Sequence, residues 1–461
     1  MLRRVVVLCL AGCVVWSMVA PSVGAESGGR DASEKLLARL DLALIVQGTF
    51  RVSPDSRRVA YVAAVGEKQA VVVDGKQEKA YDSIGAPGPI FSPDSKRVVY
   101  YAQVGEKWFV LVDGKGQKQY DGIGVPGPKF SPDSKRVAYH AVAGGKWVAV
   151  VDGKEEKPYE GIGAPGPIFS SDGKRVAYAA LAGGKCFAVV DGKEGKAYDG
   201  VGAPGVVLGA DGKRVAYIAA VGEKRLVVVD AKEDKMYEDI GGLTLSPDGR
   251  RVAYIAGIGD KRFVVVDGKE DKQYDGIAIL TFSMDSKKVA YMAGLGDKRF
   301  VVVNGKQEKP YDSIGEPGPV FSPDGGRLAY IARTGNTRSV VVDGKEQKGY
   351  EGIGLLTFSP DGKRLAHIAA AGGKAFAVVD RKEEKQYDNV DLLTFSADSR
   401  RFAYGVKVGA REFVVVDGQE GNEYSGIVAV GGGGIVFDSP DKLHYLGIKG
   451  DGIYIVEESL K

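Results

Sequence analysis

Short apolar runs alternate with polar turn residues along nearly the whole chain. In the stretch 89–124, four candidate strands lie at 90–92, 97–102, 108–112 and around Tyr120. The segments between them are Pro93-Asp94-Ser95-Lys96, Gly105-Glu106-Lys107 and Asp113-Gly114. Asp-Gly accepts the positive φ angles of two-residue hairpins, which explains the third of these turns. The pattern predicts a four-stranded antiparallel meander.

The third strand of each unit is apolar on both sides, as in Val71-Val72-Val73, Val227-Val228-Val229 and Val264-Val265-Val266. Such a strand must be covered on both faces, which happens when one sheet lies between two others. A Tyr six residues after the first turn Asp is expected to pack between sheets with its hydroxyl group hydrogen-bonded. This Tyr recurs at Tyr61, Tyr100, Tyr139, Tyr178, Tyr217, Tyr254, Tyr291, Tyr330 and Tyr404.

The unit repeats with a period of 37 or 39 residues. The first turn Asp of the ten complete copies is Asp55, Asp94, Asp133, Asp172, Asp211, Asp248, Asp285, Asp324, Asp361 and Asp398, and a shortened copy follows at Ser439-Pro440-Asp441. Periods near 40 with four short strands each are typical of β-propeller blades. The fold class predicted is therefore all-β, a propeller of about ten or eleven blades.

The eleventh copy supplies three candidate strands, at 434–437, 442–448 and 452–457, and we expect 43–46 to complete its sheet. Pairing the two chain ends would close the ring and remove exposed sheet edges. Residues 31–40 are expected to form a short amphipathic helix, with Leu36, Leu37 and Leu40 on one side. One large ring is favoured over two tandem propellers of five and six blades, because no linker marks a boundary. An open superhelical array is a third arrangement.

The first 25 residues have the features of a signal peptide. Arg3 and Arg4 precede an apolar stretch at 5–20, and Pro21 leads to Val23-Gly24-Ala25, a cleavage site before Glu26. This predicts a secreted or periplasmic protein with no transmembrane span after cleavage. Leu10-Ala11-Gly12-Cys13 also matches a bacterial lipobox, so a lipid anchor at Cys13 is an alternative. The domains expected are 1–25, the N-terminal segment 26–46 and the propeller 47–461.

Composition narrows the function classes. The chain has 461 residues, 44% of them hydrophobic, with 66 Gly and a formal net charge of +3. Loss of Arg3 and Arg4 with the leader lowers that charge to +1, so no bulk basic field exists for nucleic acid. Cys186 is the one Cys beyond the leader, which excludes an intramolecular disulfide and a cysteine metal cluster in the mature chain.

The signals for catalysis and metal binding are weak. The chain has three His, at His140, His367 and His444, and lacks the His-Glu-x-x-His and Gly-x-Ser-x-Gly motifs. The Asp residues of Asp-Gly turns, such as Asp74 and Asp113, lack the several closely spaced oxygen ligands that Ca²⁺ needs. We therefore predict no catalytic residue, no metal and no cofactor.

The repeated phrase Ser-Pro-Asp-Gly-Lys-Arg-Val-Ala-Tyr resembles the repeat of the TolB-like, WD40-like β-propellers. These occur in bacterial envelope proteins and in the propeller domains of prolyl oligopeptidase-type enzymes. The resemblance covers roughly residues 47–455. It implies the fold and says little about activity. TolB-like proteins have six blades and an additional N-terminal domain, so their usual partners do not follow from it.

The strand order assigns loops to two faces of the ring. The link face holds the second-to-third-strand loops and the links between blades, and the turn face holds the Ser-Pro-Asp and Asp-Gly turns. The link face is expected to carry a Lys in most copies. The Pro-Gly loops at Pro87, Pro126, Pro165, Pro204 and Pro317 are expected there too.

The residue after that Lys varies most between copies, and we call it the variable position. In chain order it is Gln69, Trp108, Trp147, Cys186, Arg225, Arg262, Arg299, Arg338, Ala375 and Glu412. Trp and Arg are favoured interface anchors, and an arc of Arg suits carboxylates or sulfates. The candidate binding residues are therefore Trp108, Trp147, Arg225, Arg262, Arg299 and Arg338. The alternative is an ordinary solvated strand end whose charge is neutralised by Glu67, Glu106, Glu223, Asp260 and Asp297.

The function expected is that of an exported, non-enzymatic scaffold that binds a protein or an acidic ligand on one face. One alternative is a polysaccharide lyase or hydrolase whose site lies in the channel, because propellers host many activities. A self-associating surface protein is the other alternative.

Overall fold

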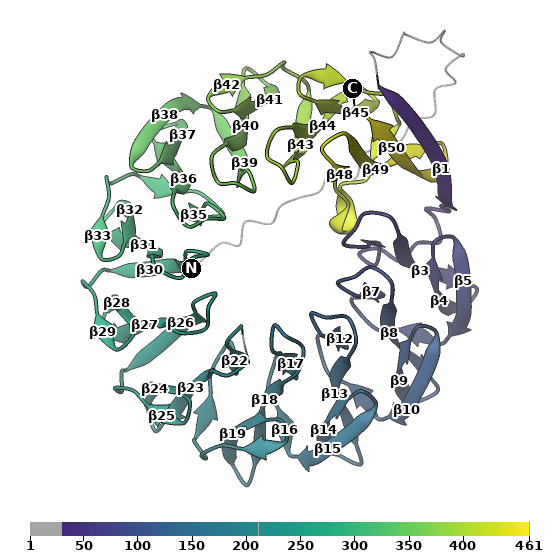
Figure 1. Cartoon of the computed structure of the whole chain (residues 1–461). Helices are drawn as coiled ribbons and strands as arrows, with labels where there is room; N and C mark the ends of the chain where they lie inside the picture. The colour runs from purple at the N-terminus through teal and green to yellow at the C-terminus, as the bar shows by residue number, and fades with distance from the viewer. Residues whose placement is uncertain (1–29, 211, 461) are drawn as a thin grey trace.

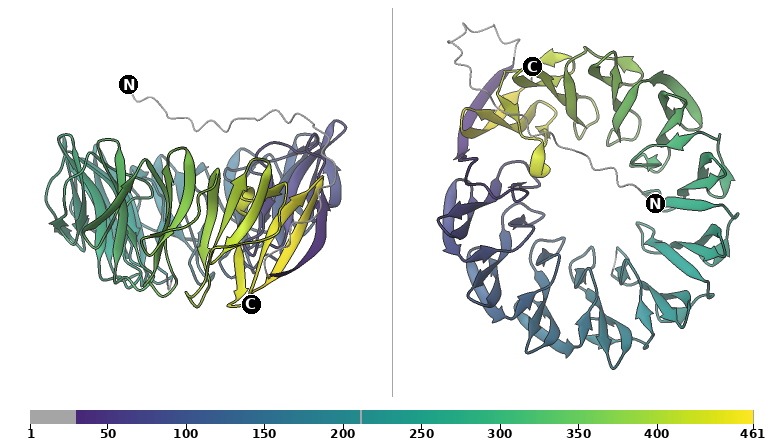
Figure 2. Two further views of the ribbon diagram at one scale, coloured as in Figure 1. Left: turned by 90° about the horizontal axis from the view of Figure 1, so that it is seen from above. Right: turned by 180° about the vertical axis from the view of Figure 1, so that it is seen from behind.

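The computed structural model describes residues 30–210 and 212–460. Its strands form eleven separate antiparallel sheets. These stand side by side around one closed ring, seen face-on in Figure 1 and from two further directions in Figure 2. The prediction of one ring is confirmed, and neither two tandem propellers nor an open array is formed. The predicted signal peptide, residues 1–25, lies outside the described residues.

Each of the first ten sheets is a meander whose strands run from the channel to the rim in chain order. The second strands of the eleven blades are β3 (Val59–Val65), β8 (Val98–Val104), β13 (Val137–Ala143), β18 (Val176–Ala182), β23 (Val215–Val221), β27 (Val252–Ile258), β31 (Val289–Leu295), β36 (Leu328–Thr334), β40 (Leu365–Ala371), β44 (Phe402–Val408) and β49 (Lys442–Lys449). The third strands are β4 (Lys68–Val73), β9 (Lys107–Val112), β14 (Lys146–Val151), β19 (Lys185–Val190), β24 (Lys224–Val229), β28 (Lys261–Val266), β32 (Lys298–Val303), β37 (Thr337–Val342), β41 (Lys374–Val379), β45 (Arg411–Val416) and β50 (Gly452–Ser459).

The fourth strands form the outer rim. They are β5 (Lys76–Tyr81), β10 (Lys115–Tyr120), β15 (Lys154–Tyr159), β20 (Lys193–Glu194), β25 (Lys232–Glu233), β29 (Lys269–Glu270), β33 (Lys306–Gln307), β38 (Lys345–Tyr350), β42 (Lys382–Glu383), β46 (Gln419–Glu420) and, in the eleventh blade, β1 (Asp31–Arg39). Several are short because the chain leaves the sheet after two residues and returns at the blade's Tyr. Cys186, for example, pairs with Tyr198 through an isolated bridge.

The innermost strands are irregular. Six blades have a first strand in two pieces: β6 (Ser83–Ile84) with β7 (Ile90–Phe91), β11 (Gly122–Ile123) with β12 (Lys129–Phe130), β16 (Gly161–Ile162) with β17 (Ile168–Phe169), β21 (Gly200–Val201) with β22 (Val207–Leu208), β34 (Ser313–Ile314) with β35 (Val320–Phe321), and β47 (Gly426–Ile427) with β48 (Val436–Ser439). A 3-10 turn, η1 (Val430–Gly432), separates the last pair. The first blade has β2 (Arg51–Val52), and four blades have a continuous strand: β26 (Asp239–Leu245), β30 (Gly276–Phe282), β39 (Gly352–Phe358) and β43 (Asn389–Phe395).

The placement of the Pro-Gly loops on the link face was wrong. Each of these loops interrupts a first strand, because the two halves, such as β6 and β7, pair with the same second strand, β8. The loops point toward the middle of the ring (Figure 1). Pro87, Pro126, Pro165, Pro204 and Pro317 each follow a cis peptide bond. The 37-residue copies have a shorter bulge at this place, in which Gly242, Ile279, Leu355 and Leu392 have positive φ.

The chain ends pair, as predicted, but through different residues. Residues 31–39 form the strand β1 and not a helix, and β1 pairs antiparallel with β50 from Asp31↔Ser459 to Arg39↔Gly452. The Leu spacing fits a helix, but the free edge of β50 offers backbone groups that only a strand can satisfy. Residues 43–46 do not close the ring, because Ile45 makes an isolated bridge to Ala63 of the first blade.

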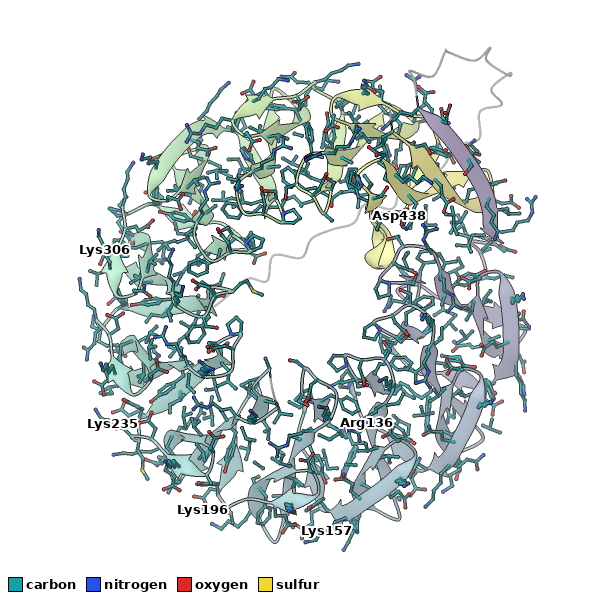
Figure 3. All side chains as sticks on the ribbon, viewed as in Figure 1. Arg136, Lys157, Lys196, Lys235, Lys306 and Asp438 are labelled. Atoms are coloured by element: carbon teal, nitrogen blue, oxygen red, sulfur yellow. The ribbon has the colours of Figure 1, made fainter. Side chains whose placement is uncertain are left out.

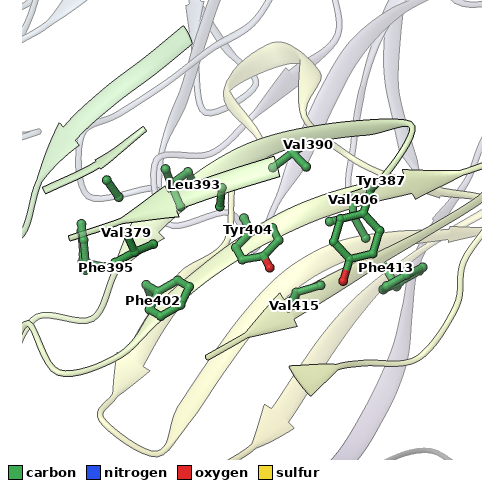
Figure 4. Close-up of a cluster of buried hydrophobic side chains, with 12 residues drawn as sticks. Val379, Tyr387, Val390, Leu393, Phe395, Phe402, Tyr404, Val406, Phe413 and Val415 are labelled. Atoms are coloured by element: carbon green, nitrogen blue, oxygen red, sulfur yellow. The ribbon is translucent and has the colours of Figure 1, made fainter. Parts of the chain in front are cut away.

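The hydrophobic core lies between neighbouring blades. One cluster, drawn in Figure 4, joins Val379 of the ninth blade to Tyr404, Phe413 and Val415 of the tenth. The Val runs are buried as predicted, with Val264 and Val265 both at 0% exposure. The predicted role of the recurrent Tyr is confirmed in copies such as Tyr178, which is buried and donates to Glu156 of the preceding blade at 2.6 Å. Each blade therefore completes the core of its neighbour.

Candidate functional site

Apart from the Pro-Gly loops, the assignment of loops to two faces agrees with the hydrogen bonds. On the turn face, the N–H of Val98 donates to Asp113 Oδ1 at 3.0 Å, which joins a Ser-Pro-Asp turn to an Asp-Gly turn. On the link face, the N–H of Gly105 donates to Asp82 Oδ2 at 2.7 Å, which joins a second-to-third-strand loop to a blade link. The rim between the faces carries Lys residues in or just after the fourth strands, including Lys157, Lys196, Lys235 and Lys306 (Figure 3).

The links between blades supply the carboxylates that pair with link-face Lys residues. Asp121, in the link after the second blade, accepts from Lys107 Nζ at 2.5 Å and from the N–H of Gly144 at 2.8 Å. The hydrogen bond from Lys107 and the one from Gly144 lower the pKa of Asp121. Because Lys107 and Gly144 belong to successive blades, this aspartate joins the two blades. Glu67, Glu106, Glu223, Asp260 and Asp297 form no ion pair within the described residues.

The side chain at the variable position faces the first strand of the next blade. Gln69 Oε1 accepts from the N–H of Ile84 at 2.8 Å, and Glu412 Oε2 accepts from the N–H of Ile427 at 2.7 Å. Trp108 and Trp147 are half-buried at this seam. Their rings lie 5.5 Å from the Tyr101 ring and 5.2 Å from the His140 ring, between centroids. Side chains at the variable position therefore partly fill the space between neighbouring blades.

The four Arg of the predicted arc lie on consecutive blades and bind near their own seams. Arg225 Nη1 pairs with Asp239 Oδ1 at 2.6 Å, and Arg338 Nη1 donates to the carbonyl of Glu351 at 2.6 Å. Arg262 and Arg299 each donate to two carbonyl groups of the adjoining loop, including Gly259 and Gly296. Arg225, Arg299 and Arg338 remain exposed.

Arg299 borders a cavity of about 310 Å³ that also exposes Met292, Ile277 and Gly294. A guanidinium beside an apolar wall suits an anchored carboxylate or an apolar side chain of a partner. The structure thus places part of the predicted arc beside a cavity, whereas Trp108 and Trp147 lie several blades away and do not share that cavity.

The inner bulges are a second candidate surface, which the sequence reasoning missed. Val125 is 75% exposed, Val430 68%, Leu355 46% and Ile279 40%, and each lies in the bulge of a first strand. Figure 3 shows that the middle of the ring stays open when the described side chains are drawn. The signal in the sequence was the difference between 37- and 39-residue copies, which marks where the first strand carries extra residues.

The three His are buried. Burial lowers the pKa of His140 to about 4, with Lys129 nearby adding to the effect, and burial lowers that of His367 to about 4. His444 lies between the first and eleventh blades, with Nδ1 2.8 Å from Asp438 Oδ2 and Nε2 2.7 Å from the carbonyl oxygen of Asp55. These environments serve blade packing and ring closure.

Within residues 30–210 and 212–460, no three His, Cys, Asp or Glu side chains gather in a way that could hold a metal ion. No helix in the same residues has the length and apolar character needed to cross a membrane.

Comparison with known proteins places the chain only at the level of fold. No family model matches it, and no curated protein matches it in sequence. A structure titled "eukaryotic initiation factor" aligns with a TM-score of 0.42 and 12% identity over 74% of this chain and 97% of the other. TolB from Acinetobacter baumannii aligns with a TM-score of 0.26 and 18% identity over 49% and 63%. The β-propeller domain of the Trilobed protease from Pyrococcus furiosus aligns with a TM-score of 0.29 and 14% identity over 56% and 93%. The structural similarity to TolB and to propeller domains is therefore distant.

Proposed function

We propose that this protein is a non-enzymatic binding scaffold, exported to a bacterial envelope or the extracellular space. One observation carries the proposal: most polar side chains that recur in every blade are used to join blades. Asp121 on the link face and Tyr178 between blades are examples. The side chains that differ between blades, at the variable position and in the inner bulges, are those left for a ligand.

The binding surface we favour is the link face around Arg225, Arg262, Arg299 and Arg338, with Trp108 and Trp147 as a separate aromatic sector. The cavity beside Arg299 and the exposure of three of the four Arg support this choice. A partner with carboxylate groups and apolar side chains fits such a surface.

The proposal is tested by capture from an envelope extract with the purified mature chain. A variant carrying Trp108→Ala, Trp147→Ala, Arg262→Glu and Arg299→Glu is expected to lose the captured partner. The matched control carries Lys96→Glu and Lys135→Glu, which reverse two exposed charges on the turn face. Capture that persists in the link-face variant and disappears with Val125→Asp and Leu355→Asp would instead assign binding to the inner bulges.

Export is tested separately. The mass of the protein recovered from the cell envelope or medium should correspond to a chain that begins at Glu26, and Cys13→Ala should leave its location unchanged. Loss of membrane association in Cys13→Ala would favour the lipid-anchored alternative, and recovery of the full chain from the cytoplasm would contradict export.

A further inference from the structure

In nine of the ten complete copies, an arginine occupies the same position on the turn face, between neighbouring blades. Arg97 shows the arrangement, because its Nε donates to Asp113 Oδ2 of the same blade at 2.9 Å. Its Nη1 donates to the carbonyl oxygens of Ser134 and Lys135 in the next blade, at 3.1 and 3.0 Å. The guanidinium carbon lies 5.3 Å from the centroid of the Phe130 ring, also in the next blade. The Arg side chain therefore fills the seam, as a planar group with several donors can.

The seam between the seventh blade (β30 to β33) and the eighth blade (β34 to β38) departs from this arrangement at three positions. Lys288 replaces the Arg of the other nine complete copies, and Asn304 replaces their Asp. Gly326 replaces the Lys or Arg that the other nine copies have at the turn. The three residues come from two blades, yet all of them line one cavity of about 470 Å³. A cavity of about 410 Å³ lies at the equivalent place of the preceding seam, where Arg251 and Asp267 keep the usual arrangement. The departures therefore change the polar groups that line the space and do not create it.

Two side chains at this seam keep N–H groups that no described residue accepts. Asn304 Oδ1 accepts from the N–H of Val289 at 2.9 Å, as Asp113 does from Val98, which fixes the orientation of the amide. The Asn304 amide nitrogen therefore points where the second carboxylate oxygen of Asp113 lies, and no described residue accepts from it. Lys288 Nζ donates to the carbonyl of Gly326 at 2.6 Å, which leaves two of its three N–H groups.

Lys306 adds a second cation to the cavity lining, and it is exposed without an ion pair to any described residue. The carboxylates in the same lining are already engaged. Glu308 accepts from the Tyr330 hydroxyl group at 2.7 Å, and Asp343 accepts from Arg327 Nε at 3.2 Å. The uncommitted groups are therefore donors and cations.

The cavity also has an aromatic wall. Phe321 lines it at the position that Phe130 has in the third blade. No cation of the described residues lies over the Phe321 ring, whereas Arg97 lies over Phe130. Gly326 has no side chain to cover the opening. The volume is within the range of cavities that bind small molecules.

We propose that this cavity binds a small organic anion. A carboxylate would accept from Lys288, Asn304 and Lys306, and a flat or apolar body would lie against Phe321. Charge-assisted hydrogen bonds from two ammonium groups would hold the oxyanion. The site lies on the turn face, so its failure would leave the link-face scaffold proposal unaffected.

Ligand-observed fluorine NMR with 4-fluorobenzoate tests the proposal. The intact mature chain is expected to bind this probe at about 1 mM or below. The neutral analogue 4-fluorobenzamide is expected to bind at least about tenfold more weakly, because it has no charge to pair with Lys288 and Lys306. Absence of 4-fluorobenzoate binding, or equal binding of the two probes, overturns the proposal.

The decisive variant is Lys288→Arg with Asn304→Asp, which restores the arrangement that nine other copies fold with. It is expected to melt at or above the temperature of the natural chain and to lose 4-fluorobenzoate binding. The matched control, Arg97→Lys with Asp113→Asn in the second blade, is expected to leave that binding unchanged. Binding that survives in the restored variant overturns the site.

Discussion

Gly124 lies directly over the imidazole ring of His140, so closely that a Cβ atom on Gly124 would overlap the ring. At the equivalent place in the next blade, a Cβ on Gly163 would meet the Cβ of Ala179 at an ordinary distance of 3.4 Å. His140 is one of the few residues that make the third blade differ from its neighbours. Gly124 and His140 therefore allow a test of packing at the inner bulge, and the equivalent Gly163 in the next blade serves as the control.

Gly124→Ala is expected to destabilise the protein by about 2–4 kcal/mol, because a buried ring and the backbone must move apart. Gly163→Ala should change stability by less than about 0.5 kcal/mol. Thermal unfolding of the two variants measures the difference. Adding His140→Ala to Gly124→Ala should recover most of the loss caused by the Gly124 change, and a failure to recover it would show that backbone strain, not the ring, is the cause.

Loss of the Arg97 contacts between the second and third blades is expected to lower the stability of the protein. Arg97→Ala removes one ion pair, two hydrogen bonds to carbonyl groups and the contact with Phe130, and is expected to cost about 2 kcal/mol. The ion pair contributes little to this cost because solvent screens it: the Arg97 and Asp113 side chains are 30% and 43% exposed. Thermal unfolding measures it, with the neighbouring Lys96→Ala as the neutral control. Equal melting temperatures for the two variants would contradict the inter-blade role.

Replacing Asp391 by a neutral residue is expected to stabilise the protein at neutral pH. Burial, with a smaller contribution from the nearby Glu412 carboxylate, raises the pKa of Asp391 from 3.8 to about 6. The unfolded chain therefore loses its proton first, and stability falls as the pH rises from about 4 to 6. Asp391→Asn should stabilise the protein by about 2 kcal/mol above pH 6 and by little below pH 4. Melting temperatures across that range check this, and a gain that does not depend on pH would contradict it.

The link-face aspartates predict acid sensitivity. The hydrogen bonds from Lys107 and Gly144 lower the pKa of Asp121 below 3.8, so this carboxylate stabilises the fold above that pH. The contribution is lost as the pH falls through the lowered pKa. The melting temperatures of the natural chain and of Asp121→Asn should therefore differ at pH 6 and converge toward pH 2. A difference in melting temperature that stays the same at all pH values would show that the contribution of Asp121 does not depend on its charge.

Closure by β1 predicts that the N-terminal strand is needed for a monomeric ring. Deletion of residues 31–39 should expose the edge of β50, lower the melting temperature and produce edge-to-edge dimers. Light scattering coupled to size-exclusion chromatography measures the mass. Glu34→Gln is the milder control, because it keeps the strand and weakens only the contacts with Tyr424 and Lys449, at 2.8 and 2.6 Å. A monomer with unchanged melting after the deletion would contradict closure by this strand.

The sequence by itself determined the blade, showed about ten or eleven copies of it, and indicated which turns share a face. The spacing of the turn Asp residues counts the copies, the Val runs require a neighbour on each side, and Asp-Gly requires a tight turn. These are local properties of the chain. They also identify the variable position, because the ten copies can be compared with one another.

Only the tertiary structure decided how the ring closes, where the bulges point and which residues join the blades. Leu36 and Leu37 fit a helix locally, but the free edge of β50 favours a strand. Asp121 joins Lys107 to Gly144, and Arg97 reaches Lys135, across seams that no local pattern displays. The cavity at Lys288, Asn304 and Gly326 has the same origin, since residues from two blades meet there only after the ring has formed.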